Sequence, residues 1–234
     1  MALFPRWAGT DEAAPPQPFH DRFEAGRELA KHLAAYANHS DAIVLGLPRG
    51  GVAVAHEVAR ALNLPLDVFI VRKLGVPGQE ELAMGAIASG GVRVLNHAVV
   101  QALGLSQADI DAVIRKEEQE LRRREQEFRG QRPPLDLKGK IVILVDDGLA
   151  TGATMWAAIT AVRQQEPAKI VMAVPIADPS SCDAFKQIAD EVVCAVTAEP
   201  LHAIGLWYQD FAQVTDEEVR SLLSASPSAG GKGA

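Results

Sequence analysis

Cysteine is scarce in this sequence, which holds two, Cys182 and Cys194, among 234 residues. Their spacing matches no zinc-binding pattern, so a zinc site is not expected. Cys194 lies in the apolar run 192–196 and is typical of a small buried side chain. We interpret Cys182 in the same way. So few cysteines fit a reducing compartment, where disulfides are rare.

Long apolar stretches are also missing. The longest aliphatic runs are as short as 141–145, whereas a membrane-spanning helix needs about 20 apolar residues. The first residues mix Arg6 with Asp11, Glu12 and three prolines, which is unlike the basic start and apolar block of a signal peptide. We therefore expect no membrane association and a cytoplasmic location.

An excess of positive charge is absent as well. The chain carries 23 Lys and Arg against 30 Asp and Glu, a formal net charge of -7. Non-specific nucleic-acid binding depends on clustered positive charge that displaces counterions, so a nucleic-acid partner is disfavoured. Segment 106–129 carries both signs of charge at helical spacing, which favours a solvated helix face. A basic nucleic-acid patch there is the alternative.

Segments 1–18 and 224–234 read as an irregular start and a disordered, Ser-, Ala- and Gly-rich tail, leaving 19–223 as the folded domain. Within it, continuous Val/Ile runs alternate with helical patterns, which predicts an α/β fold with a parallel twisted sheet flanked by helices. The predicted strands are 42–47, 66–71, 140–145, 170–175 and 192–196. The predicted helices are 20–37, 52–62, 106–129, 154–165 and 180–189. A small β-hairpin (82–88 and 92–95) and the long helix form an insertion.

The sharpest motif is the segment 141–155, IVILVDDGLATGATM. It predicts a buried strand that ends in two acids, followed by a loop of small residues and a helix N-terminus. In open α/β sheets, ligands lie beyond the carboxyl ends of strands. A helix N-terminus offers free N–H groups and a positive dipole end to a phosphate. Small residues let the backbone approach that phosphate closely, and two threonine hydroxyls can add donors.

Other readings of this segment fit less well. A Walker A loop needs a lysine where Ala153 stands, and neither 46–51 nor 148–153 supplies Gly-x-Gly-x-x-Gly. Asp146 and Asp147 could merely cap a loop. However, a diacid, a phosphate-type loop and a strand–loop–helix context occur here together. Two adjacent carboxylates can accept hydrogen bonds from a sugar diol.

The segment resembles the signature of type I phosphoribosyltransferases, which bind 5-phosphoribosyl-1-pyrophosphate (PRPP). The resemblance covers about residues 40–200 and implies that family's fold, with a separate hood region near 201–215. It also implies an enzyme that transfers the 5-phosphoribosyl group of PRPP to a nitrogenous acceptor, a nucleobase, and releases pyrophosphate. Mg²⁺ would be the cofactor, carried mainly by PRPP rather than by direct ligands from the chain.

The resemblance assigns roles to individual positions. Asp146 and Asp147 would contact the ribose 2- and 3-hydroxyls, and residues 150–154 would hold the 5-phosphate. The implied PRPP site comprises Asp146, Asp147, Gly148, Ala150, Thr151, Gly152, Ala153 and Thr154.

Pyrophosphate would bind at an earlier loop, which in the family often contains a non-proline cis peptide. Arg49, Gly50 and Gly51 match that loop, with an ordinary Pro-Gly turn as the alternative. Arg72 and Lys73 match a basic position after the next strand, with a solvated strand end as the alternative. The implied catalytic residues are Asp146, Asp147, Arg49 and Lys73.

Two further regions follow from the resemblance. Segment 74–91 would be the mobile loop that closes over the reacting centre. In the hood, Trp207, Tyr208 and Phe211 would stack on the base, with core packing or a subunit contact as the alternative. The chain also departs from the pattern. Ala150 stands where some purine enzymes carry an acid, which disfavours a hypoxanthine/guanine mechanism. Gly148 replaces a more usual branched residue.

Other functions remain open beside the enzyme. A PRPP- or nucleotide-sensing regulator could keep the fold without the chemistry, although no helix-turn-helix is evident. A protein that binds partners through the helix 106–129 is the third possibility. We also expect a homodimer.

Overall fold

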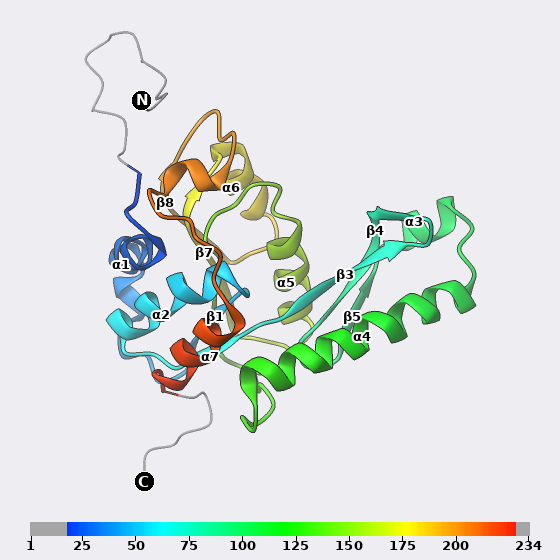
Figure 1. Ribbon diagram of the computed structural model, residues 1–234, viewed down its shortest axis with the longest axis horizontal. Coiled ribbons are helices and arrows are strands. Elements are labelled where there is room, and N and C mark those ends of the chain that lie inside the picture. The colour runs from blue at the N-terminus through cyan, green and yellow to red at the C-terminus, as the bar shows by residue number, and fades with distance from the viewer. Residues whose placement is uncertain (1–17, 228–234) are drawn as a thin grey trace.

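The computed structural model describes residues 18–227 (Figure 1). The expectations for the irregular start and for the end of the tail therefore lie largely outside the described residues. None of the described helices is both long and apolar enough to cross a membrane.

The main sheet has five strands in the order β2-β1-β6-β7-β8, and every neighbouring pair is parallel. This confirms the predicted parallel sheet. Its strands are rich in Val, Ile and Leu because helices cover both faces. Their bounds are β1 (Ala42–Gly46), β2 (Leu66–Val68), β6 (Ile141–Val145), β7 (Lys169–Ala177) and β8 (Glu191–Thr197).

Alternate strand residues point to opposite faces and form two separate cores. On one face Val44, Ile143 and Val171 pack with α1 (Arg22–His32) and α2 (Gly50–Leu62). On the other face Leu45, Leu144 and Met172 pack with α5 (Ala153–Arg163) and α6 (Pro179–Phe185). The C-terminal α7 (Asp216–Ser224) packs into the first core. The chain also has two short 3-10 helices, η1 (Ala34–Tyr36) and η2 (Ile204–Trp207), in its described part.

The sheet order places a topological switch point between β1 and β6. From β1 the chain continues to β2 on one side, and β6 pairs with β1 on the other, with Gly46 opposite Val145. Ligands of open α/β sheets bind in the crevice outside the carboxyl ends of such strands. The loops that follow β1 and β6 therefore meet, although they are distant in sequence.

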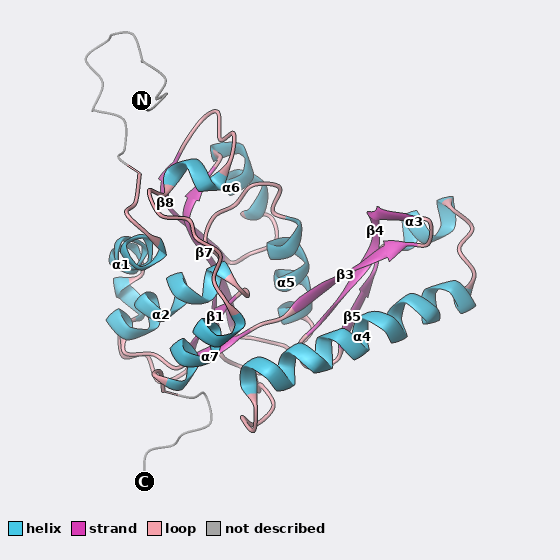
Figure 2. Cartoon of the chain, viewed as in Figure 1, coloured by secondary structure: helices cyan, strands magenta, loops and turns pink. Residues whose placement is uncertain are grey.

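A long arm extends away from this sheet (Figure 2). It contains an antiparallel sheet, β3 (Val71–Val76), β4 (Gln79–Ala88) and β5 (Val92–Leu95), followed by α3 (His97–Ala102) and α4 (Gln107–Arg129). The predicted strand 66–71 is wrong in extent, because the chain leaves the main sheet after Val68 and enters the arm at Val71. Segment 74–91, expected as a mobile loop, forms most of the β3–β4 hairpin.

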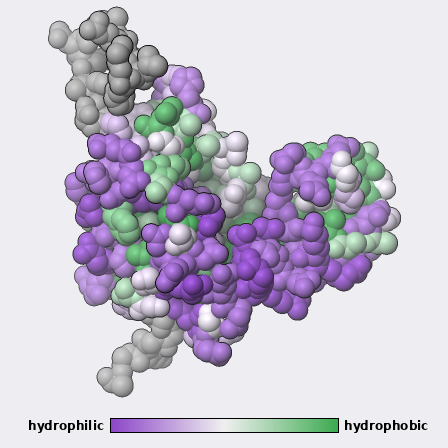
Figure 3. Space-filling model, in the orientation of Figure 1, coloured by the Kyte–Doolittle hydropathy of each residue, from purple (hydrophilic) through white to green (hydrophobic). Residues whose placement is uncertain are grey.

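Helix α4 agrees with the sequence-based prediction. It begins after Ser106, whose hydroxyl accepts the Asp109 N–H at 3.2 Å. Arg123 Nε and Nη1 donate to Glu120 and Glu127, each at 2.8 Å. The viewed side of the arm along α4 is hydrophilic (Figure 3). These contacts confirm the solvated, charge-paired helix face.

The C-terminal end of α4 is anchored to β2 through the buried Asp67. This side chain accepts hydrogen bonds from Arg129 Nε at 3.0 Å and Nη2 at 3.1 Å. Arg132 Nη1 lies 3.7 Å from the same carboxylate and donates to the Leu66 carbonyl at 2.8 Å. Because Asp67 is only 2% exposed, these contacts replace its lost hydration.

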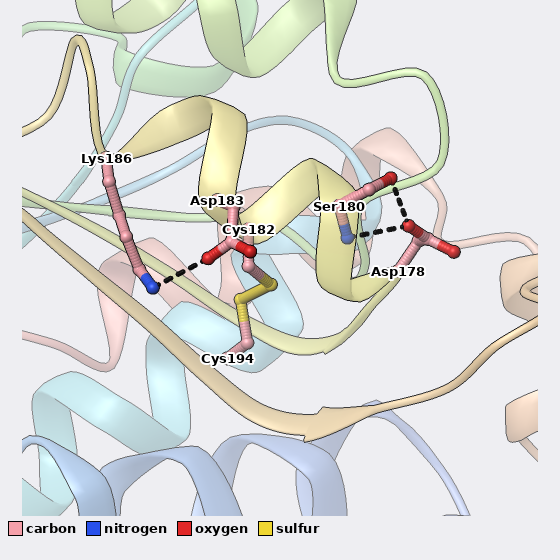
Figure 4. The surroundings of a disulfide bond; sticks show 6 residues. All are labelled: Asp178, Ser180, Cys182, Asp183, Lys186 and Cys194. Atoms are coloured by element: carbon pink, nitrogen blue, oxygen red, sulfur yellow. Dashed lines mark hydrogen bonds and ion pairs between the residues drawn. A yellow bond between two sulfur atoms is a disulfide. The ribbon is translucent and has the colours of Figure 1, made fainter.

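Cys182 of α6 and Cys194 of β8 form a disulfide (Figure 4). The interpretation of both as small buried side chains did not include this bond; Cys182 is buried as expected, whereas Cys194 is half-buried. The two lie 12 residues apart, and their Cα atoms are 6.9 Å apart because α6 packs directly on β8. Neither the number nor the spacing of the cysteines predicts that α6 packs on β8 and brings the two sulfur atoms together.

We expect Asp67→Ala to lower the free energy of unfolding by about 3–5 kcal/mol, because it leaves two arginines partly buried without their partner. Urea unfolding measures the loss. Asp183→Ala is the control, since its ion pair with Lys186 is exposed on both sides and should contribute little. Equal losses in the two variants would contradict the anchoring role of Asp67.

Candidate functional site

The loops after β1 and β6 pack so closely that two positions require glycine. A Cβ on Gly50 would overlap the Oδ2 atom of Asp147. A Cβ on Gly51 would lie 2.7 Å from the Val145 carbonyl oxygen and 2.9 Å from Asp146 Oδ1. The structure thus brings the predicted pyrophosphate loop and the acid pair into direct contact.

Arg49 directly precedes Gly50 and is the N-cap residue of α2. The peptide bond between Pro48 and Arg49 is cis, the feature that the family resemblance implies for this loop. The side chain is 36% exposed, and its Nη1 lies 3.8 Å from Asp216 Oδ1 at the start of α7. Because that ion pair is long and solvated, the guanidinium remains available to an anionic ligand.

Each acid uses one carboxylate oxygen for internal contacts. Asp146 Oδ1 accepts the backbone N–H of Asp147 at 2.9 Å. Asp147 Oδ2 accepts Arg22 Nε at 2.8 Å. No other hydrogen bond from residues 18–227 reaches either carboxylate. One oxygen of each acid therefore has no hydrogen-bond partner in this part of the chain, and we call these two the open oxygens. The arrangement suits two neighbouring hydroxyl groups.

The two acids differ electrostatically. Burial raises the pKa of Asp146 well above its ordinary value, and the neighbouring Asp147 carboxylate raises it further. Arg22 and the Asp147 N–H act in the opposite direction without cancelling these effects. The site therefore opposes placing a second negative charge beside Asp147.

The loop from Ala150 to the start of α5 presents free donors. Gly152 has a φ of 70° and precedes α5, which has no side-chain cap. Within the described part of the chain, no hydrogen bond satisfies the amide groups of residues 150–155. Just before this loop, the Leu149 N–H donates to the carbonyl of Ile176 in β7 at 2.9 Å, which fixes the start of the loop. An uncapped helix N-terminus of this kind binds anions.

The packing around this loop explains two of its glycines. A Cβ on Gly148 would lie 2.7 Å from Cγ2 of Ile204 in η2. A branched side chain, which the resemblance implies as more usual at this position, would overlap Ile204. At Gly152 a Cβ would lie 2.6 Å from the ring of Phe185 in α6.

The predicted base-stacking residues fall into different environments. Tyr208 is 5% exposed, and its hydroxyl donates to the Asp147 carbonyl at 2.6 Å. Its ring stacks on Phe211 with centroids 4.9 Å apart, so its role is at least partly structural. Phe211 is 37% exposed and Trp207 is half-buried. Both rings keep exposed surface, and Phe211 lies near the acid pair through its contact with Arg22.

Two predicted pyrophosphate ligands are paired elsewhere. Arg72 Nε and Nη2 donate to Glu117 Oε2 at 2.9 and 2.6 Å. Lys73 Nζ lies 3.4 Å from Glu81 Oε2. Both side chains belong to β3 in the arm, and no hydrogen bond or ion pair of the described residues joins them to the acid pair or to Arg49.

Sequence reasoning missed Arg22. Its guanidinium lies 3.8 Å from the Phe211 ring centroid, and its Nη1 donates to the Ala212 carbonyl at 2.8 Å. One signal was present, because Arg22 shares a helical face with Ala25 and Leu29, which are fully buried. A charged residue on such a face is rarely buried unless it is paired.

Asp146→Asn should stabilise the folded protein at neutral pH. The pKa of Asp146 is raised on folding, so its ionisation is favoured in the unfolded chain above about pH 3.9. Wild-type stability is therefore lost as pH rises toward the folded pKa, at up to about 1.4 kcal/mol per pH unit, and asparagine avoids this loss. Chemical unfolding between pH 4 and 8 measures the difference. A variant that is less stable than wild type at pH 7 would contradict the raised pKa.

Known proteins resemble this chain in sequence and in fold. A solved structure, TT1426 from Thermus thermophilus, superimposes with a TM-score of 0.80 at 42% identity, covering 90% of this chain and all of that one. The "Putative phosphoribosyl transferase Rv0571c" of Mycobacterium tuberculosis is 50% identical over 205 residues, which are 88% of this chain and 46% of that protein. The chain thus spans about half the length of this curated relative.

A more distant relative is the "Bifunctional protein PyrR" of Chloroflexus aurantiacus, which is 32% identical over 131 residues, 55% of this chain and 66% of that protein. The family model "Phosphoribosyl transferase domain" matches residues 78–199, just over half of the sequence. On this match the chain belongs to the phosphoribosyl transferase domain family.

Proposed function

We propose that the chain is a phosphoribosyltransferase that uses PRPP and Mg²⁺ and transfers the phosphoribosyl group to a nitrogenous acceptor, a nucleobase. The observation that carries this proposal is the arrangement at the switch point. Asp146 and Asp147 each present one open oxygen beside an uncapped anion-binding loop and opposite the cis loop at Arg49.

The three parts of PRPP match three parts of the site. The free amides of residues 150–155 and the hydroxyls of Thr151 and Thr154 suit the 5-phosphate. The open oxygens of Asp146 and Asp147 suit the ribose hydroxyls. The start of α2, where Arg49 provides no side-chain cap, suits the pyrophosphate.

Cleavage of the C1–O bond places positive charge on the ribose and negative charge on pyrophosphate. The Asp147 carboxylate favours the positive charge nearby, and Arg49 with the α2 amides favours the negative charge. Mg²⁺ bound to pyrophosphate would supply further charge neutralisation. The acceptor nitrogen then attacks C1 and completes the transfer. Trp207 and Phe211 offer exposed aromatic surface for the acceptor base.

Recruitment of Arg72 and Lys73 to pyrophosphate requires their present ion pairs to break. Glu81, the partner of Lys73, is fully exposed, so that pair costs little to open. Arg72 forms two hydrogen bonds to Glu117, whose side chain is 13% exposed. Lys73 is thus the more readily recruited residue, through movement of the β3–β4 hairpin over the site, where it would exclude water.

A PRPP-sensing regulator is the second candidate. It is favoured by the present pairing of Arg72 and Lys73 with arm residues, which leaves only Arg49 at the pyrophosphate loop. A regulator would bind Mg-PRPP without releasing pyrophosphate in the presence of any base.

Light scattering would test the expected homodimer for either candidate.

Joint replacement of Asp146 and Asp147 by asparagine should lower pyrophosphate release from PRPP by at least about 100-fold, because the ribose loses both carboxyl groups, including the charged Asp147. Release is measured with Mg²⁺ across a panel of nucleobases. Asp183→Asn is the control, since this carboxylate pairs with Lys186 on the surface. Unchanged turnover in a folded double variant would refute the assignment.

Arg49→Ala should weaken pyrophosphate binding about tenfold or more, through loss of a charged hydrogen bond. Binding of a nucleoside monophosphate, which has no pyrophosphate group, should change by less than about twofold. Calorimetry with the two ligands gives the comparison. Equal losses for both ligands would show that Arg49 does not mark the pyrophosphate position.

A further inference from the structure

Arg22 connects the acid pair to the hood. We define the hood strap as residues 204–212, which run from η2 to the Ala212 carbonyl. The Arg22 side chain is 10% exposed, and it reaches Asp147 through Nε and Ala212 through Nη1, both at 2.8 Å. Its rigid, planar guanidinium therefore contacts both the strap and Asp147, the residue proposed to bind the ribose.

A second set of contacts leads from Arg22 through the strap back to Asp147. The Arg22 guanidinium lies over Phe211, Phe211 stacks on Tyr208, and the Tyr208 hydroxyl donates to the backbone carbonyl of Asp147. Asp147 is thus fixed through both its carboxylate and its carbonyl. A displacement of the strap must disturb at least one of these contacts with Asp147.

Phe19 and His20, just before α1, form backbone hydrogen bonds with the strap. The Phe19 N–H donates to the Trp207 carbonyl at 2.9 Å, and the Phe19 carbonyl accepts the Gln209 N–H at 2.8 Å. The Asp210 N–H donates to the His20 carbonyl at 2.8 Å. Phe19 and His20 are therefore paired with the strap only two to three residues before Arg22, which ties the start of α1 to it.

The charges explain why a cation is needed here. Asp146 and Asp147 are adjacent acids, and Arg22 is the one basic side chain of the described residues within hydrogen-bond distance of either. A lysine would supply the charge. However, it could not donate in two directions while lying flat on Phe211, because only a guanidinium has that planar fork.

We propose that Arg22 is a positioning residue that couples the ribose-binding acids to the hood strap, so that binding of PRPP orders the surface on which the acceptor is placed. This inference rests on the proposed function. In it, Arg22 touches neither PRPP nor the acceptor. It acts through Asp147 on one side and through Phe211 and Ala212 on the other.

The test compares wild type with Arg22→Gln, Arg22→Lys and the control Arg27→Gln. Arg27 lies on the same helix, is half exposed and has only a 3.9 Å contact with Glu57. Hydrogen exchange of the strap is followed by mass spectrometry, with and without saturating Mg-PRPP. Calorimetry measures PRPP affinity in parallel, and thermal unfolding confirms that each variant is folded.

In wild type, Mg-PRPP should slow exchange of residues 204–212. In Arg22→Gln, strap exchange without ligand should rise about tenfold or more, and PRPP affinity should fall about 10- to 100-fold, as expected for loss of a charged hydrogen bond. PRPP at saturation should no longer slow strap exchange. Arg22→Lys should recover affinity better than strap protection, and Arg27→Gln should behave as wild type.

Two failures can be told apart. If wild type binds Mg-PRPP but Arg22→Gln leaves strap exchange and its protection by PRPP within about twofold of wild type, the coupling role of Arg22 is wrong and the proposed function stands. If wild type does not bind Mg-PRPP, the proposed function fails, and the coupling inference fails with it.

Discussion

The close packing of two loops at the switch point of the sheet is the constraint on which the rest of the site depends. Gly50 and Gly51 let the start of α2 reach the end of β6, where a Cβ at either position would overlap or crowd the acids. This contact places a helix N-terminus, two carboxylates and the anion-binding loop before α5 at the same edge of the sheet. Neither loop could form the site without the other.

Close packing also has an electrostatic cost, which the neighbouring elements reduce. Two adjacent acids in a partly buried position repel each other, and burial together with the Asp147 carboxylate raises the pKa of Asp146. Arg22 from α1 compensates the charge of Asp147, and the Tyr208 hydroxyl fixes its backbone. The segments before and after the core of the fold are therefore part of the site.

Local patterns predicted much of this molecule. The strand, diacid and loop of 141–155 and the cap of α4 at Ser106 are each encoded by neighbouring residues. The prediction of one strand over 66–71 was wrong in extent because almost all of these residues are apolar. Composition does not reveal that the chain changes from one sheet to the other within this run. The Cys182–Cys194 bond and the Arg22–Asp147 pair depend on contacts between separate elements, the second spanning 125 residues.

The central claim is that the open oxygens of Asp146 and Asp147 bind a ribose diol. Calorimetric comparison of ribose 5-phosphate with 2-deoxyribose 5-phosphate tests it most directly, because the two ligands differ by one hydroxyl group. The geometry predicts that ribose 5-phosphate binds about tenfold or more tightly, the value of a hydrogen bond to a charged acceptor. Equal affinities for the two sugars would contradict the claim.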